Sequence, residues 1–207
     1  ITFQKRLEKI GKHVRGTRIL DIGCNRGTFL EAAKEAGWEC YGVDINEGVK
    51  EECEKKGIYF FHGTLEKIKF KENFFDVIIM NDLIEHVHDP QALLQQARKI
   101  LRPRGVIFIV TPDVESYAAH FLKKRWPHLK PNEHLMYFSK KTLKKMLKEE
   151  GFTMLEVNHI GRWRKIGTIL HKGRGVWRGM RTIEKIIPSS LMKMNIFCNF
   201  YDELYVI

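Results

Sequence analysis

The sequence contains no run of about 18 consecutive apolar residues, the minimum length of a membrane-spanning helix. Its four cysteines include no C-x-x-C pair, which argues against a zinc-binding knuckle. Residues 1–10 are charged and helical in pattern, unlike a secretory signal peptide. These absences make a reduced, cytoplasmic protein the simplest interpretation, with a peripheral position at a membrane left open.

Acidic residues are absent from positions 157–183, where several arginines and lysines lie. The whole chain carries 36 basic and 25 acidic residues, a net charge of +11. Such a balance favours anionic partners such as nucleic acid, phosphates or a membrane surface. The basic segment 161–187 is therefore interpreted in three ways: as a cap over a substrate pocket, as an interfacial segment at a lipid surface, or as a nucleic-acid contact. No recognised RNA-binding module accompanies it, which makes nucleic acid the weakest of the three.

Between residues 17 and 157, short apolar runs alternate with helical patterns. This alternation predicts an α/β fold with a doubly wound, mostly parallel sheet whose binding sites lie at the carboxyl ends of the strands. The predicted strands are Arg18–Ile22, Glu39–Val43, Tyr59–His62, Phe75–Met80, Val106–Val110 and Phe152–Val157. The predicted helices are Thr28–Ala36, Gly48–Lys56, Pro90–Leu101 and Lys140–Glu150.

We expect one domain over residues 1–207, with a core at about 14–157. A closing strand, Leu204–Ile207 within 199–207, is expected to pair at the sheet edge. Residues 113–138 and 161–193 are expected to form a small, mostly helical cap. The oligomeric state is left open.

The first predicted strand enters a glycine-containing turn, Asp21-Ile22-Gly23-Cys24-Asn25-Arg26-Gly27, before a helix begins at Thr28. Gly23 and Gly27 allow close approach of a ligand to the backbone, and the helix start offers free N–H groups to a carboxylate. Asp21 is positioned to accept from an ammonium group. The turn therefore suits an amino-acid head group, although a turn with a purely structural role is the alternative. The dinucleotide fingerprint G-x-G-x-x-G is not met, which weakens an NAD hypothesis.

Asp44 ends the second predicted strand, in Gly42-Val43-Asp44-Ile45. An acidic residue at this place binds ribose hydroxyls in nucleotide-binding sheets. Taken alone, Asp44 could equally be a helix N-cap. Together with the glycine turn, the ribose role is favoured.

These two motifs, in this order, resemble the first two motifs of class I S-adenosylmethionine-dependent methyltransferases. The resemblance continues through Gly63-Thr64-Leu65-Glu66, Phe75-Asp76-Val77-Ile78, Leu83-Ile84-Glu85-His86-Val87 and Leu101-Arg102-Pro103-Arg104-Gly105. It implies S-adenosylmethionine as the cofactor. Its methionine part would contact Asp21, Gly23, Asn25 and Gly27, its ribose and adenine would contact Asp44 and Ile45, and Thr64 and Leu65 would flank the adenine. Asn81, directly after the fourth predicted strand, is also assigned to this site.

The reaction implied by this cofactor needs a positioned nucleophile, and a general base if that nucleophile is a hydroxyl or a protonated amine. His86 is the first candidate base because imidazole titrates near neutrality and His86 follows the fourth strand. Glu85 and His134 complete the catalytic prediction. The alternative is that His86 has a structural role, as a helix cap or packed under the loop.

A second hypothesis concerns a divalent metal ion. The spacing of Asp82, Glu85 and His86 predicts that they share one helical face, and His134 is a further candidate ligand. The pattern resembles the acidic-x-x-Glu-His segment of ubiquinone-pathway O-methyltransferases and of small-RNA 2′-O-methyltransferases. Because Glu-His also occurs in relatives for which no metal is implied, metal use remains the lesser option.

The resulting hypothesis is methyl transfer from S-adenosylmethionine to an oxygen of a small or lipid-like acceptor. Methylation of RNA is one alternative. A cofactor-binding regulatory protein without catalytic activity is the other.

Overall fold

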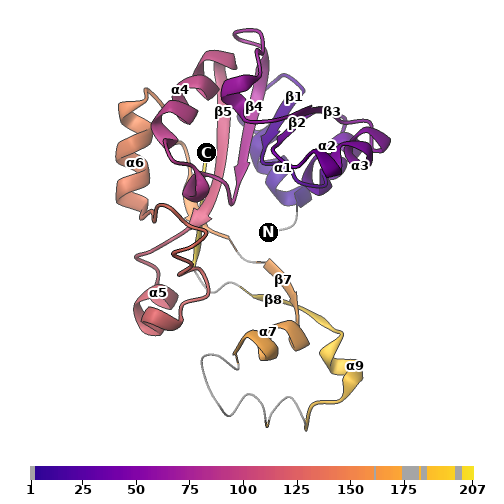
Figure 1. Cartoon of the computed structure of the whole chain (residues 1–207), viewed down its shortest axis with the longest axis vertical. Coiled ribbons are helices and arrows are strands. Elements are labelled where there is room, and N and C mark those ends of the chain that lie inside the picture. Colours follow the sequence, from indigo (N-terminus) through magenta and orange to yellow (C-terminus); the bar gives the residue numbers. More distant parts are fainter. Residues whose placement is uncertain (1–2, 161, 174–181, 183–185, 199–201) are drawn as a thin grey trace.

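The computed structural model describes residues 3–160, 162–173, 182, 186–198 and 202–207 (Figure 1). Its main sheet has seven strands in the order β3-β2-β1-β4-β5-β9-β6. β9 runs antiparallel to β5 and β6, and the remaining neighbours are parallel. The predicted mostly parallel, doubly wound sheet is therefore confirmed. The strands are β1 Arg18–Ile22, β2 Glu39–Asp44, β3 Tyr59–His62, β4 Phe75–Asn81, β5 Leu101–Pro112, β6 Val157–His159 and β9 Glu203–Val206.

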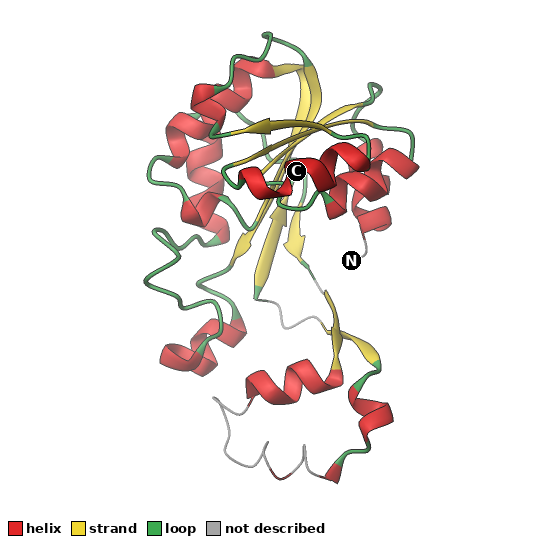
Figure 2. Cartoon of the chain, turned by 45° about the vertical axis from the view of Figure 1, so that its right-hand side comes forward, coloured by secondary structure: helices red, strands yellow, loops and turns green. Residues whose placement is uncertain are grey.

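Helices cover both faces of this sheet (Figures 1 and 2). One apolar cluster joins the sheet to α1, α2 and α3, and a second joins its other face to α4 and α6. β4 lies between the two clusters and is buried along nearly its whole length, as its unbroken apolar sequence predicts. The helices are α1 Phe3–Gly11, α2 Thr28–Glu35, α3 Lys50–Lys55, α4 Pro90–Ile100 and α6 Lys140–Glu149.

Side-chain caps define where α4 and α6 begin. The Asp89 carboxylate accepts from the Ala92 amide at 2.9 Å, and Pro90 occupies the first turn of α4. At α6, Ser139 and Thr142 form a reciprocal capping box. Short 3-10 helices lie at Glu47–Val49, Leu65–Lys67, Ile84–His86 and Lys123–Arg125.

Two predictions about the end of the sheet are wrong. Residues 152–156 are not a strand, because regular pairing with β9 begins at Val157 and the preceding segment makes backbone hydrogen bonds with this end of the chain only at Ile207, through Leu155 and Glu156. The closing strand β9 does not lie at the edge, since it inserts between β5 and β6. Non-local pairing decides both points, and local sequence patterns carry no information on it.

Two further parts extend from the end of the sheet at which β5 ends (Figures 1 and 2). The first contains α5 Tyr117–Leu122. The second contains the helices expected in segment 161–193, as α7 Ile166–Gly173 and α9 Ser189–Met192, but also an unpredicted ribbon. In that ribbon, β7 Arg162–Lys165 pairs antiparallel with β8 Asn195–Cys198. Residues 174–181 and 183–185 of the predicted basic segment lie outside the described residues.

Within the described ranges, every helix is too short or too polar to cross a bilayer.

Candidate active site

The turn after β1 has the geometry of a small-ligand cradle. Gly23, Asn25 and Gly27 all have left-handed backbone conformations, with φ of 77°, 46° and 66°. The amides of Gly23 and Cys24 donate to the Val43 carbonyl at 2.8 and 3.1 Å, which ties the turn to the end of β2. The turn is therefore preformed, with α2 starting directly behind it.

Gly27 has no tolerance for a side chain. A Cβ at this position would lie 2.5 Å from Cδ1 of Ile58 and 3.2 Å from Sγ of Cys53, in addition to the strain of a positive φ. The left-handed backbone of Gly27 lets the chain turn from the strand into α2, whose first amides are available for anion binding at a helix start.

Asp44 lies beside this turn at the end of β2. One carboxylate oxygen accepts from the Asn25 amide at 2.7 Å and the other from the Asn46 amide at 2.8 Å. The carboxylate is thus oriented by one backbone donor from the turn after β1 and by another from the segment after β2. It is not the N-cap of the following 3-10 helix, since Asn46 caps that helix.

The predicted adenine contacts Ile45, Thr64 and Leu65 follow the ends of β2 and β3 and differ in exposure. Ile45, directly after Asp44, is 73% exposed, an unusual state for an apolar side chain. Its carbonyl contacts Nε2 of His62 at 3.0 Å. Thr64 occupies the N-cap position of the next 3-10 helix without a side-chain capping bond, and Leu65 is buried within that helix. An exposed apolar side chain beside an oriented carboxylate suits the flat face of a base next to a ribose.

Asp21 is buried under the turn, and burial raises the pKa of its carboxyl to about 8. Arg6, from α1, lowers this pKa in part. The buried guanidinium of Arg6 also donates from Nη1 to Oδ1 of Asn81 at 2.9 Å. Asn81 ends β4, so one polar cluster combines α1, β1 and β4 at the carboxyl edge of the sheet.

Glu85 is the most deeply buried acid near the end of β4, with 1% of its surface exposed. Its side chain accepts from the Thr111 hydroxyl at 3.0 Å. Its carbonyl accepts from the amides of Leu135 and Met136 at 2.8 and 3.1 Å. Burial raises the pKa of Glu85 to about 7. Glu85 therefore connects β5 with the loop that carries His134.

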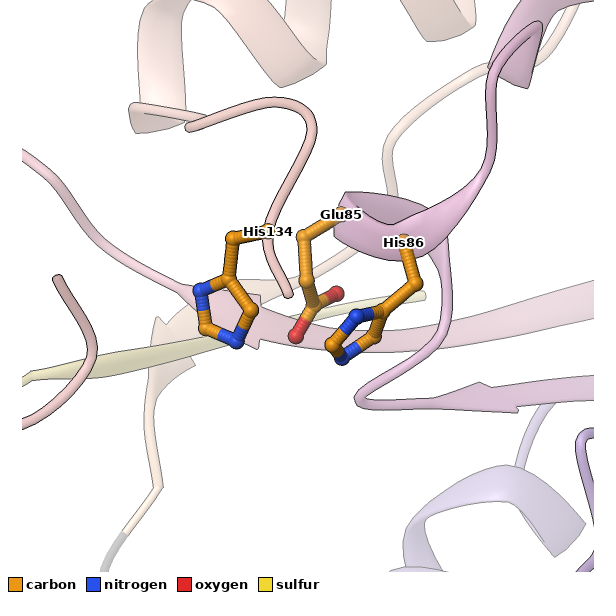
Figure 3. Close-up of side chains that lie close together, drawn as sticks. All are labelled: Glu85, His86 and His134. Carbon is orange, nitrogen blue, oxygen red and sulfur yellow. The ribbon is translucent and has the colours of Figure 1, made fainter. Parts of the chain in front are cut away.

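His86 and His134 face each other beside this carboxylate (Figure 3). Their ring centroids are 4.7 Å apart and the rings are nearly perpendicular. Nδ1 of His86 lies 2.7 Å from the Glu133 carbonyl, which requires a proton on Nδ1 and leaves Nε2 as the basic nitrogen. His134 is buried, and burial with the neighbouring His86 lowers its pKa.

The three predicted catalytic residues thus come together, whereas Asp82 does not join them. One ligand atom each of Glu85, His86 and His134 lies within 4.8 Å of the others, a spacing that can accommodate a metal ion. Asp82 has a left-handed φ of 50° and precedes the short helix Ile84–His86. The expected helical face from Asp82 to His86 is therefore wrong, because the chain turns sharply before the helix begins.

Two polar residues of this region were not found by sequence reasoning. The sequence predicts only a charged helix for the segment that contains Arg6, and Thr111 directly follows the predicted strand Val106–Val110. Arg6 reaches the site through the packing of α1 against α2, and Thr111 through the parallel register of β4 and β5. Neither contact has a local sequence signal.

Comparison with known proteins agrees with this geometry. The family model described as a methyltransferase domain matches residues 2–157. An uncharacterised protein of Methanocaldococcus jannaschii is 28% identical over 152 residues, which are 73% of this chain and 72% of that protein. A ubiquinone biosynthesis O-methyltransferase of Haemophilus ducreyi is 31% identical over 107 residues, 46% of this chain and 45% of that enzyme. The match thus spans less than half of that enzyme.

The fold also matches solved structures. An S-adenosylmethionine-dependent methyltransferase of Mesorhizobium loti superimposes with a TM-score of 0.63 at 18% identity, over 98% of this chain and 94% of that protein. At this identity the likeness concerns the fold.

Proposed function

The chain belongs to the methyltransferase domain family, and on this premise we propose that it transfers the methyl group of S-adenosylmethionine to an oxygen of a small or lipid-like acceptor. Membership confirms the resemblance seen in the sequence, and with it S-adenosylmethionine as the cofactor. The alternatives of RNA methylation and of a non-catalytic regulatory protein are not favoured by these relatives. The observation that supports oxygen transfer best is the convergence of Glu85, His86 and His134 at the carboxyl end of β4.

The proposed cofactor site contains positively polarised groups for the methionine carboxylate and an acidic group for the methionine ammonium. The methionine carboxylate would face the start of α2 and the buried guanidinium of Arg6, which pairs well with carboxylates. The methionine ammonium would face Asp21. A bound ammonium stabilises the ionised form of Asp21, whose pKa is otherwise raised by burial. Asp44 and Ile45 would contact the ribose and adenine.

The proposed acceptor site lies beside Glu85. Nε2 of His86 would take the proton of the acceptor hydroxyl as oxygen attacks the methyl carbon and the bond from that carbon to sulfur breaks. The Glu85 carboxylate would stabilise the imidazolium that forms. For this role Glu85 must be ionised, and its raised pKa makes that a pH-dependent condition near neutrality.

A divalent metal ion is the second candidate for the group that activates the acceptor hydroxyl. The spacing of the ligand atoms of Glu85, His86 and His134 favours it. One carboxylate and two imidazoles fit a borderline ion such as Zn²⁺ or Mn²⁺. The Glu133 carbonyl on Nδ1 of His86 would then orient a ligating ring. A bound ion would make the acceptor hydroxyl more acidic.

The lipid-like character of the acceptor is supported by α5. Tyr117 and Phe121 are 87% and 85% exposed and lie one helical turn apart, on one face of α5. Lys123 and Lys124 follow directly and are exposed. Exposed aromatic rings next to lysines suit the surface of an anionic membrane. α5 extends from the same end of the sheet as the active site, so an acceptor could enter from that surface (Figure 1).

Calorimetric titration of the chain with S-adenosylmethionine, and separately with NAD, tests the cofactor part of this proposal. Saturable binding of S-adenosylmethionine alone is expected. A panel of hydroxyl, amine and RNA acceptors with labelled cofactor then tests the acceptor class. Label transfer to amines or RNA but to no hydroxyl compound would overturn oxygen transfer while leaving the family assignment intact.

A further inference from the structure

A cavity of about 610 Å³ lies at the amino end of β5, at the opposite end of that strand from Thr111 and Glu85. Its walls come from the start of β5, from residues 151–155 before β6, and from Val206 and Ile207. No residue assigned above to the active site lines it. A volume of roughly 300–1,000 Å³ suits a small organic ligand.

An irregularity in the sheet shapes this cavity. Phe75 pairs with Leu101 but Val77 pairs with Val106, so residues 102–105 leave the regular ladder between β4 and β5. Such a bulge redirects side chains out of the sheet. Within it, Arg104 has a left-handed φ of 64°, a conformation that glycine adopts far more readily. Arg104 is exposed and lines the cavity in spite of this unfavourable backbone conformation.

The described lining residues are mostly basic or apolar, with Asn73 and Thr153 as neutral polar members, and they include no Asp or Glu. Nη1 of Arg102 donates to Oδ1 of Asp76 at 2.8 Å, so the charge of Arg102 is compensated. Nη1 of Arg98 donates only to the neutral carbonyl of Glu150, at 3.0 Å. Arg98 and Arg104 therefore keep an uncompensated positive charge within the described part of the chain. The apolar part of the wall includes Leu101, Leu147, Phe152, Met154 and Val206.

We propose that this cavity binds an anionic amphiphile, with the acidic headgroup at Arg98 and Arg104 and the apolar chain along Leu147 and Met154. A guanidinium pairs with a carboxylate or a phosphate through two parallel hydrogen bonds. The apolar wall gives a hydrocarbon chain a surface on which to leave water. The headgroup is therefore a carboxylate or a phosphate, and the ligand carries an apolar chain.

Calorimetric titration of the full chain with decanoate, decyl phosphate, decanol and inorganic phosphate tests this proposal. Saturable binding of decanoate or decyl phosphate is expected, and whichever binds more tightly identifies the headgroup. Decanol lacks the acidic headgroup, and inorganic phosphate lacks the apolar chain. If either binds as tightly as the matching amphiphile, the proposal is wrong.

Variants connect this binding to the cavity. Arg104→Gly removes the charge at a backbone conformation that suits glycine, so the fold is retained. We expect it to weaken amphiphile binding on the order of tenfold, through loss of a charge-assisted hydrogen bond. Lys144→Ala, which removes an exposed charge from α6 outside the cavity, should leave binding unchanged. Equal binding by Arg104→Gly and the parent chain overturns the site. S-adenosylmethionine affinity is measured in parallel and stays unchanged, so failure here is distinct from failure of the proposed function.

Discussion

The hydroxyl of Thr111, near the end of β5, donates a 3.0 Å hydrogen bond to the buried carboxylate of Glu85, just beyond the end of β4. Thr111 is fully buried, so no water replaces this donor. The bond fixes the direction of the carboxylate toward His86 and His134. It also lowers the pKa of Glu85, against the larger opposite effect of burial.

Replacing Thr111 by Val should therefore raise the pKa of Glu85 above its value of about 7. If turnover needs ionised Glu85, the acidic limb of the pH profile of kcat/KM moves to higher pH. Thr111→Ser keeps the donor and should restore the original limb. A limb that stays in place in Thr111→Val would show that turnover does not depend on the ionisation of Glu85.

The sequence predicted the strands that carry local signals. β1 to β4 were found to within a residue, because each is a short apolar run next to glycine or a charged residue. The insertion of β9 between β5 and β6 was not found, since it depends on a pairing about ninety residues apart in the chain. For the same reason the ribbon of β7 and β8 had no local signature.

The candidate site likewise contains some residues that local sequence patterns predict and others that only long-range packing brings there. Asp21 lies next to the last residue of a predicted strand, and Asp44 and Glu85 follow predicted strands, so the rule that binding sites lie at strand ends was enough to select them. Arg6 reaches Asn81 across 75 positions of the chain, and only the packing of α1 brings the two together. Asp82 was misplaced because a regular helix was assumed where the backbone takes a left-handed turn.

Asp21→Asn should change how stability depends on pH. The pKa of Asp21 is raised from 3.8 to about 8 by burial, so the folded chain binds a proton that the unfolded chain has lost. The stability that the Asp21 carboxyl contributes is then greatest at low pH and falls as the pH rises from 3.8 to about 8, and Glu85 acts in the same direction between 4.5 and about 7.

The Asp21→Asn variant has no carboxyl to ionise at this position, so it does not lose stability in this way as the pH rises. In the absence of cofactor, we expect it to gain about 1–3 kcal/mol relative to the parent chain on the alkaline side of the window. Urea unfolding at about pH 5 and about pH 9 measures the difference. The same variant should bind S-adenosylmethionine more weakly, since its ammonium loses an ionised partner. If the stability difference between the variant and the parent chain does not grow from about pH 5 to about pH 9, the assigned direction for Asp21 is wrong.

Arg6→Met should weaken S-adenosylmethionine binding by about 10–100-fold, the effect of losing a hydrogen bond to a charged group. Met retains much of the apolar stem of Arg, so the packing of α1 is disturbed little. Lys12→Met, at an exposed position after the same helix, is the matched control. Calorimetry with S-adenosylmethionine and with a decarboxylated analogue completes the test. If Arg6 contacts the carboxylate, the variant binds both ligands with similar affinity.

His86→Ala should lower kcat by about 10²–10⁴-fold, the usual contribution of a general base. Cofactor affinity should not change, because His86 lies outside the turn at Asp21. Under the base hypothesis, dialysis against EDTA leaves the turnover of the parent chain intact. Loss of turnover on dialysis, with recovery on adding Mn²⁺ or Zn²⁺, would instead support the ion held by Glu85, His86 and His134. Cobalt absorption, lost in His134→Gln, would then locate the ion.

The exposed rings of α5 give the last prediction. Each ring that leaves water on a membrane contributes about 1.5–3 kcal/mol, so the double variant Tyr117→Ser/Phe121→Ser should bind anionic vesicles at least on the order of tenfold more weakly. Tyr59→Ser, which removes a 58% exposed ring from β3 at the other edge of the sheet, is the matched control.

Sedimentation with phosphatidylglycerol-containing vesicles measures the binding, and added salt should weaken it through Lys123 and Lys124. Turnover of an acceptor embedded in those vesicles should fall with binding, whereas turnover of a water-soluble analogue should not change. This pattern arises only if α5 acts in delivery of the acceptor, since damage to the active site would lower both rates. Equal vesicle binding by the double variant and the parent chain would exclude α5 as a membrane contact and leave the acceptor to be sought among water-soluble hydroxyl compounds.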